Sequence, residues 1–353
     1  MFGPFHRAEI TGLDVCIRKE LIATCSKDRT VSVWNYAHKT HEISTLFTEE
    51  CLTLAFHPSG LHLVLALQDK IQMCKVLSNS IQSYKQLTVK GCNEIRFSNG
   101  GHLFAIVVNE KNIHVYNFYT YECGERMQFQ DHTQRVMCID WFQNDMGFST
   151  CGQDGQIYFY DLFTEENESR NRAKDARRPG AKMNSIVNLP GKPYEFLAVG
   201  TEKIIFTNTE SLKAIPRTSS DPNPTPRLPD LKHHISQLAI HPSGKILFTG
   251  VGELDAPYPG AIQVWKLPFE KAAEIQAHSG PITRLRITHS NSHLFSVGSD
   301  GMLCIFDVKD RGGADPKRDD AIALGFSEEI LSDKGEVDNL QAEENQLKEK
   351  AKN

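Results

Sequence analysis

Short stretches of alternating apolar and polar residues recur along most of the chain, and one of them has a constant form. It reads apolar, any residue, apolar, and then usually an aromatic residue, as in VSVW at 31–34. Alternation with a period of two is typical of a β-strand with one buried face. We therefore predict a mostly β protein. This strand occurs seven times, ending at Trp34, Cys74, Tyr116, Tyr160, Thr207, Trp265 and Phe306.

The spacing of these strands defines an internal repeat. The intervals between successive strand ends are similar, except that the one from Thr207 to Trp265 is clearly longer. Their usual length matches the period of about 40–45 residues that is typical of a four-stranded propeller blade. Turn sequences rich in Pro or Gly occupy equivalent places in three units, at 57–60, 98–101 and 241–244. The sequence thus predicts an all-β, seven-bladed propeller over residues 1–308.

Several units also share polar residues at a constant spacing. In three of them a histidine is followed by Ser or Thr and then by Asp at the same intervals, as in His132, Thr150 and Asp154. These units resemble WD40 repeats, in which such residues form a buried hydrogen-bonded chain that locks a blade. The resemblance implies that the blade-lock residues are Thr24, Asp28, Trp34, His132, Thr150, Asp154, Tyr160, Trp265, His278, Ser296 and Asp300, with His6 completing the first unit.

Residues that could carry chemistry form no enzyme motif. The chain lacks HExxH, GxxxxGK[ST], GxSxG and CxxC, and its nine cysteines are an odd number. Several cysteines lie in apolar runs, so we expect buried, reduced thiols. The adjacent His233 and His234 lack further ligands at metal-site spacing, and their position matches that of a blade-lock histidine. We therefore expect no enzyme activity, no catalytic residue, no metal and no cofactor.

Composition narrows the class of protein further. The chain is 40% hydrophobic and 24% charged, with 39 basic and 44 acidic residues and a net charge of -5. This balance is globular and gives no global attraction to nucleic acid or to an anionic membrane. No apolar stretch approaches the roughly 20 residues that cross a bilayer, and the start lacks an apolar signal segment. A soluble, intracellular protein is expected.

Two insertions interrupt the repeat. Residues 214–230 contain five prolines, which predicts a peripheral loop without regular strand pairing. Residues 170–182 are basic and are interpreted as a solvated strand and loop, or alternatively as a contact for an acidic surface such as that of a cytoskeletal filament. The residues of this acidic-partner contact would be Arg170, Arg172, Lys174, Arg177 and Arg178.

The composition changes after residue 308. Residues 309–326 are expected to be a linker in which Ile322, Leu324 and Phe326 form the closing strand of the seventh blade, with residues 2–5 as the alternative. Ser327, followed by two glutamates, is typical of a helix N-terminus, so 327–353 is predicted to be a helix that starts a coiled coil. A charged, disordered tail is the alternative. The predicted seam consists of Ile330, Val337, Leu340 and Leu347.

Five longer stretches of sequence are more specific than the repeat pattern, namely 9–19, 21–26, 97–105, 277–283 and 324–331. They resemble the family of cilia- and flagella-associated protein 57, a WD-repeat protein of the axoneme. Members of that family look like tandem propellers followed by a long coiled coil. The resemblance implies a second propeller and the start of the coil, as a fragment or a short paralogue.

The resemblance also implies a function. The expected role is a non-catalytic scaffold of the ciliary axoneme that positions inner dynein arms or neighbouring regulators on doublet microtubules. Its partners would be axonemal proteins, tubulin among them, with no nucleic acid and no membrane, and the C-terminal helix could form an oligomer. The alternative is a general cytoplasmic WD40 adaptor of a ubiquitin-ligase or trafficking complex. A propeller hydrolase is a third class.

Overall fold

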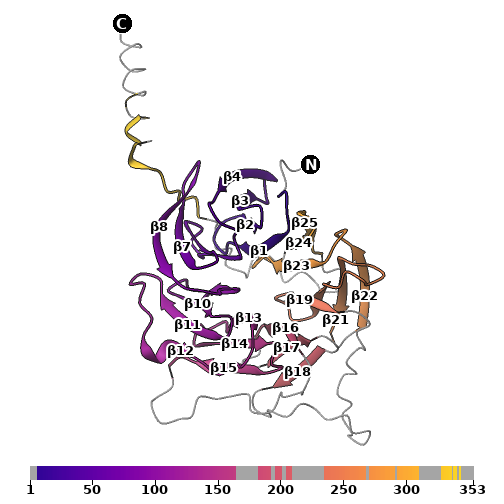
Figure 1. The fold of residues 1–353 in the computed structure, drawn as a ribbon. Helices are drawn as coiled ribbons and strands as arrows, with labels where there is room; N and C mark the ends of the chain where they lie inside the picture. The colour runs from indigo at the N-terminus through magenta and orange to yellow at the C-terminus, as the bar shows by residue number, and fades with distance from the viewer. Residues whose placement is uncertain are drawn as a thin grey trace, which may run out of the picture.

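The fold is seen in a computed structural model, which describes residues 6–163, 182–191, 195–200, 204–208, 234–267, 270–290, 292–309, 327–335, 337–339 and 342. Within these residues the strands form seven antiparallel sheets, one for each of the seven sequence units. The sheets are arranged around a common centre, and the first strand of each is the innermost (Figure 1). The chain is therefore a propeller.

Four of these sheets have four described strands, in the orders β1-β2-β3-β4, β5-β6-β7-β8, β9-β10-β11-β12 and β19-β20-β21-β22. Their bounds are β1 (Ile10–Val15), β2 (Leu21–Ser26), β3 (Thr30–Asn35), β4 (Thr40–Leu46), β5 (Thr53–Phe56), β6 (His62–Ala66), β7 (Lys70–Val76), β8 (Ile81–Thr88), β9 (Ile95–Phe97), β10 (Leu103–Val108), β11 (Asn112–Asn117), β12 (Gln128–Phe129), β19 (Ile235–Ile240), β20 (Ile246–Val251), β21 (Ala261–Lys266) and β22 (Glu270–Gln276).

Three sheets have three described strands, β13-β14-β15, β16-β17-β18 and β23-β24-β25. A short 3-10 helix, η1 (Glu125–Met127), precedes β12. The bounds of the strands are β13 (Val136–Trp141), β14 (Gly147–Gly152), β15 (Ile157–Asp161), β16 (Met183–Asn188), β17 (Glu195–Gly200), β18 (Ile204–Asn208), β23 (Ile282–Ile287), β24 (His293–Gly298) and β25 (Leu303–Asp307).

The recurring sequence pattern marks the third strand of every sheet, as predicted. Trp34 on β3 is 2% exposed and Trp265 on β21 is 7% exposed, which confirms that both are core residues. The predicted turn at 57–60 is also confirmed, because Gly60 has φ +75° and its N–H donates to the His57 carbonyl at 2.9 Å. A positive φ of this kind favours glycine.

The hydrophobic core lies between neighbouring sheets rather than within one of them. Val33 of the first sheet, for example, belongs to the same buried cluster as Leu54 and Leu65 of the second. The first and last sheets meet in the same way, since Ile10 shares a cluster with Phe295 of β24. The Thr283 hydroxyl of β23 also donates to the Ile10 carbonyl at 2.6 Å. These contacts join the two ends of the ring.

The C-terminal segment departs from the prediction. Ser327 does not start a helix, because 327–333 are non-helical and the described helical residues are 334–335, 337–339 and 342. The N–H of Ser327 instead donates to the Arg18 carbonyl at 2.8 Å. Ile330 therefore lies before the helix, 70% exposed, and is no heptad position, whereas Val337 is helical and 38% exposed.

Some predictions concern residues outside the described part of the chain. They are the closing strand at Ile322, Leu324 and Phe326, its alternative at 2–5, the proline-rich insertion 214–230, and the basic residues 170–178. Leu340 and Leu347 of the predicted seam also fall there. A coiled coil thus stays a prediction.

Replacing Trp34 by Ala should lower the free energy of unfolding by about 3–5 kcal/mol, because a large buried ring leaves a cavity. Equilibrium unfolding in urea measures the loss. Trp34→Phe is the control, since it keeps an aromatic ring in the site and loses the indole N–H with only part of the volume. A loss below about 1 kcal/mol in the Ala variant would contradict the assignment of Trp34 to the core.

Candidate functional site

The first blade lock contains all four predicted side chains. The His6 ring contacts the Thr24 hydroxyl through Nε2 at 2.8 Å and the Thr30 hydroxyl through Nδ1 at 2.7 Å. Trp34 donates its indole N–H to the same Thr24 oxygen at 3.0 Å. Asp28 lies 3.4 Å from His6 and accepts the Thr30 N–H. Burial alone would raise the pKa of Asp28, but these hydrogen bonds lower it.

The fourth sheet repeats this arrangement with one substitution. His132 contacts the Thr150 hydroxyl at 2.9 Å through Nε2 and the Asp154 carboxylate at 3.0 Å through Nδ1. Tyr160 takes the place of the tryptophan and is 1% exposed. Its hydroxyl is buried without a hydrogen bond to the described residues. The ring of Tyr160 thus fills the core while the polar chain ends at Thr150.

The seventh sheet shortens the polar chain in a comparable way. His278 contacts Ser296 at 2.8 Å and Asp300 at 3.0 Å, with the same ring nitrogens as His132. Phe306 replaces the tryptophan and has no polar atom to donate. The predicted blade-lock residues of this unit are therefore brought together, and they link the turn at Asp300 to strand β24.

In the sixth sheet His234 does not act as a blade-lock histidine, which corrects the prediction for that residue. Trp265 donates to the Thr249 hydroxyl at 3.1 Å, as a blade lock requires. The ring of His234, however, contacts the Asn184 side chain of β16 at 3.0 Å. The stretch of chain between His234 and Thr249 is shorter than that between the lock histidines and their Ser or Thr partners, which explains why its ring reaches the neighbouring sheet. His233 lies outside the described residues.

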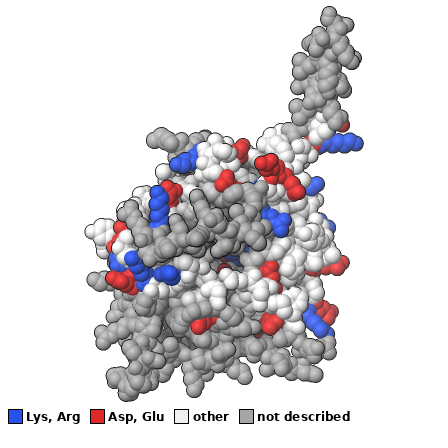
Figure 2. All heavy atoms as spheres, turned by 180° about the vertical axis from the view of Figure 1, so that it is seen from behind, with Lys and Arg blue, Asp and Glu red and all other residues white. Residues whose placement is uncertain are grey.

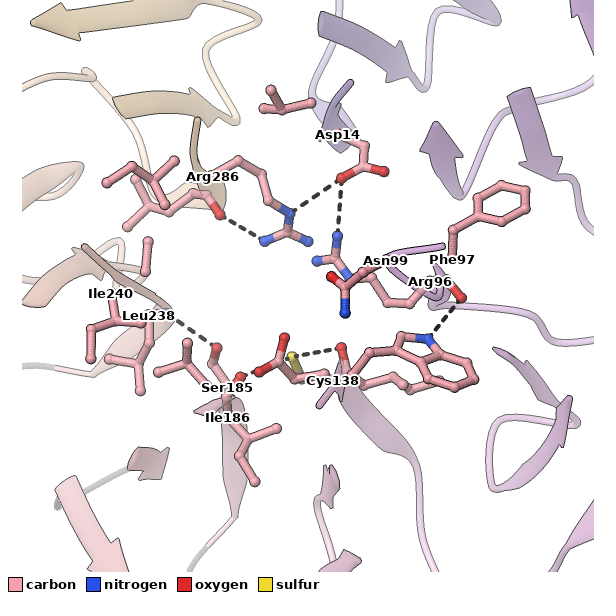
Figure 3. Close-up of a pocket in the computed structure, with 18 of the residues that line it drawn as sticks. Asp14, Arg96, Phe97, Asn99, Cys138, Ser185, Ile186, Leu238, Ile240 and Arg286 are labelled. Atoms are coloured by element: carbon pink, nitrogen blue, oxygen red, sulfur yellow. Dashed lines mark hydrogen bonds and ion pairs between the residues drawn. The ribbon is translucent and has the colours of Figure 1, made fainter. Parts of the chain in front are cut away.

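A cavity of about 260 Å³ lies at the centre of the ring. It is lined by the innermost strand of every sheet, namely β1, β5, β9, β13, β16, β19 and β23. Four of these strands contribute a charged side chain to the lining, namely Asp14, Arg96, Asp140 and Arg286. Figure 3 shows Asp14, Arg96 and Arg286 pointing toward one another. No signal in the sequence points to this site, because each residue comes from a different repeat unit and no local motif unites them.

The charges in the centre of the ring are paired across the sheets. Arg96 of β9 contacts Asp14 of β1 at 3.2 Å and Glu94 at 3.1 Å. Arg284 of β23 contacts the other oxygen of Glu94 at 2.9 Å. Arg286 is more distant, with its Nε 3.8 Å from Asp14. We call Asp14, Glu94, Arg96, Arg284 and Arg286 the central ion-pair network. It joins the first, third and seventh sheets.

The pKa values of the carboxyl groups reflect this environment. Burial raises the pKa of Asp14, although Arg96 and the Phe56 N–H oppose the shift. Burial also raises the pKa of Asp140 to about 6, while the Asn188 N–H, which donates to it at 2.7 Å, opposes that change. Asp140 therefore carries its charge at neutral pH at a cost in stability.

Burial holds the cysteine thiols in their neutral form. All nine cysteines are free, and seven are buried. Burial raises the pKa of Cys138, which lines the cavity, to about 11, and that of Cys25 to about 12. Because the thiolate is the nucleophile, thiols with such pKa values react poorly at neutral pH.

Metal ligands and membrane-spanning helices can be judged only for the described residues. That part of the chain holds no group of three or more His, Cys, Asp or Glu residues placed to bind a metal ion. Over the same residues, no helix is both long and apolar enough to cross a membrane.

Comparison with known proteins agrees with the geometry. The family model described as WD domain, G-beta repeat matches residues 4–35, 124–161 and 269–307. These are the three units with a complete His, Ser or Thr, and Asp set. Cilia- and flagella-associated protein 57 A of Tetrahymena thermophila is 36% identical over 88% of this chain, and the Mus musculus protein 57 is 34% identical over 95%. The chain belongs to the cilia- and flagella-associated protein 57 family.

A third member of the family, protein 57 C of Tetrahymena thermophila, is 31% identical over 96% of the chain. The chain spans about a quarter of the length of these curated relatives, because the matches cover 25% or 26% of each of them. The resemblance of the sequence to this family is confirmed.

Replacing Asp140 by Asn should change how stability depends on pH. The wild-type pKa of about 6 lies above the ordinary 3.8, so the folded state favours the protonated acid. The protonated carboxyl group of Asp140 therefore stabilises the folded state fully below pH 4, and this stabilisation is lost as the pH rises through 6. The amide side chain of the variant does not titrate, so the variant does not lose stability in this way. Its free energy of unfolding, relative to that of the wild type, should rise by about 1–3 kcal/mol between pH 4 and 7.

Urea unfolding at several pH values measures this difference, and Asp69→Asn, which removes an exposed carboxylate, is the control. A stability difference between Asp140→Asn and the wild type that stays constant from pH 4 to 7 would contradict the assigned environment of Asp140.

Proposed function

We propose that this chain is a non-catalytic scaffold that binds protein partners on the ciliary axoneme. The observation that carries the proposal is the match over most of the chain to relatives named cilia- and flagella-associated proteins. A propeller suits this role, because a rigid ring presents several separate loop surfaces to partners. Fold alone does not assign the function, so the family relationship is essential to the proposal.

The chemistry of the central cavity supports a role without catalysis. Arg96 and Arg284 contact carboxylates of the chain itself within 3.2 Å, so their charges are used in ion pairs between the sheets. Cys138, the thiol in the cavity, stays protonated at neutral pH. A thiol hydrolase would need an activated nucleophile, and a thiol with a pKa of about 11 is not activated at neutral pH.

We further infer that the partners are inner dynein arms, neighbouring regulators or the doublet microtubule. The resemblance of the sequence to an axonemal family supports this assignment. On the face shown in Figure 2, acidic and basic side chains of the described residues are interspersed. The basic stretch at 170–178 concentrates positive charge in the sequence, and we propose it as the contact for an acidic surface.

We also propose that the helix that begins at residue 334 continues along the chain and joins a coiled coil. The helical backbone at 334–335, 337–339 and 342 supports this extension, and Val337 offers an exposed apolar side chain on it. A short isolated helix is marginally stable in water, so a partner helix or a continuation of the chain would be needed.

Reversing the charge of the basic stretch should weaken binding to microtubules. Replacing Arg170, Arg172, Lys174, Arg177 and Arg178 by Glu changes attraction to an acidic surface into repulsion. We expect at least about a tenfold loss of affinity in a pelleting assay at low salt, and a smaller loss as screening increases with salt.

The matched control reverses as many exposed basic residues elsewhere on the ring, namely Lys90, Lys111, Arg135, Lys266 and Lys309. Equal pelleting of both variants and the wild type would refute the contact at 170–178. Separately, the tagged chain should remain with axonemes through a salt wash. Complete release into the soluble fraction would favour the general cytoplasmic adaptor.

A further inference from the structure

The segment Ser327–Leu331 runs across the rim of the ring beside the first and second sheets. The N–H of Ser327 donates to the Arg18 carbonyl, in the loop between β1 and β2, at 2.8 Å. Farther along, Leu331 forms a parallel bridge with Leu77, just after β7. Figure 1 shows the described end of the chain leaving the ring at this place. Main-chain bonds therefore attach the segment to two sheets.

Lys19 makes a third connection. Its ammonium group donates to the carbonyl oxygen of Glu329, between the other two attachments. The side chain is unusually enclosed, since Lys19 as a whole is only 9% exposed, and burial lowers its pKa. Lysine is seldom buried unless its charge has a partner. Here the partner is the main chain of the crossing segment.

The loop that carries Lys19 is itself fixed to the second sheet. The N–H of Arg18 donates to the Pro58 carbonyl at 3.2 Å, and the Cys16 thiol donates to the same oxygen at 3.4 Å. The stem of Lys19 passes over Gly60, where a Cβ atom would lie 2.6 Å from its Cδ. The absent side chain at Gly60 thus leaves room for the lysine.

The crossing segment has few apolar contacts that could hold it in place. Glu328, Glu329 and Ile330 are exposed, and Ser327 and Leu331 are half-buried. Its position therefore depends on the bonds to Arg18, Lys19 and Leu77, because hydrophobic burial contributes little there. A flexible linker would show no such bonds.

We propose that Arg18, Lys19, Leu77 and the segment Ser327–Leu331 form a rigid joint that fixes where, and in which direction, the C-terminal helix leaves the ring. The described helical residues begin at 334, only three positions after Leu331. So short a spacer transmits the orientation of the ring to the helix. This inference goes beyond the scaffold role and does not depend on which partner the ring binds.

Hydrogen exchange measured by mass spectrometry on the full chain tests the joint. In the wild type, amides of 327–331 should exchange more slowly than those of an unstructured peptide of the same sequence. Lys19→Met keeps the stem and removes the ammonium group, so exchange in this segment should accelerate about fivefold to tenfold. Lys111→Met, which changes an exposed lysine on the third sheet, is the matched control and should leave the segment unchanged.

A second variant, Ser327→Pro, removes the main-chain donor to Arg18 without changing the ring. It should accelerate exchange of the amides at 328–331 to the same extent, while peptides from β2 and β6 keep their wild-type protection. Exchange of 327–331 at the unstructured rate in the wild type would overturn the joint. Unchanged exchange in both Lys19→Met and Ser327→Pro would also overturn it.

Discussion

The central ion-pair network is the constraint on which the ring depends. Glu94 is 2% exposed and lies between Arg96 and Arg284, so its charge is satisfied only while the third and seventh sheets keep their positions. Removing Glu94 would take a carboxylate partner from both Arg96 and Arg284, and the loss of a partner from a buried charge is destabilising. Because Arg96 also contacts Asp14, the first sheet is fixed by the same charges.

The blade locks and the central network act on different parts of each sheet. A lock such as His132 with Thr150 and Asp154 fixes the turns and inner strands of one unit. The network fixes units relative to one another across the ring. Between the two, apolar side chains from neighbouring sheets fill the space, as Ile10 and Phe295 do. Local and long-range polar contacts thus support one core.

The features that were predicted correctly from the sequence are those that depend on spacing within one repeat unit. The third strands, the burial of Trp34 and the partners of His278 all follow from residues of one repeat unit, so a periodic pattern was sufficient. The central network was missed because Asp14, Glu94 and Arg284 belong to three units, and only the closed ring brings them together. The helix start was misplaced because tertiary contacts override local propensity.

The closure of the ring has a consequence for the newly made chain. The Thr283 hydroxyl contacts the Ile10 carbonyl, 273 residues earlier, and Lys19 contacts Glu329 across 310 residues. During synthesis, the first sheet therefore emerges long before the last sheet has been made. Until then its strand edges and its apolar surface stay exposed to solvent. Contacts of such sequence separation form slowly, and incomplete chains of this kind are prone to aggregate. A chaperone would therefore protect the chain most while it is still bound to the ribosome, before the last repeat unit closes the ring.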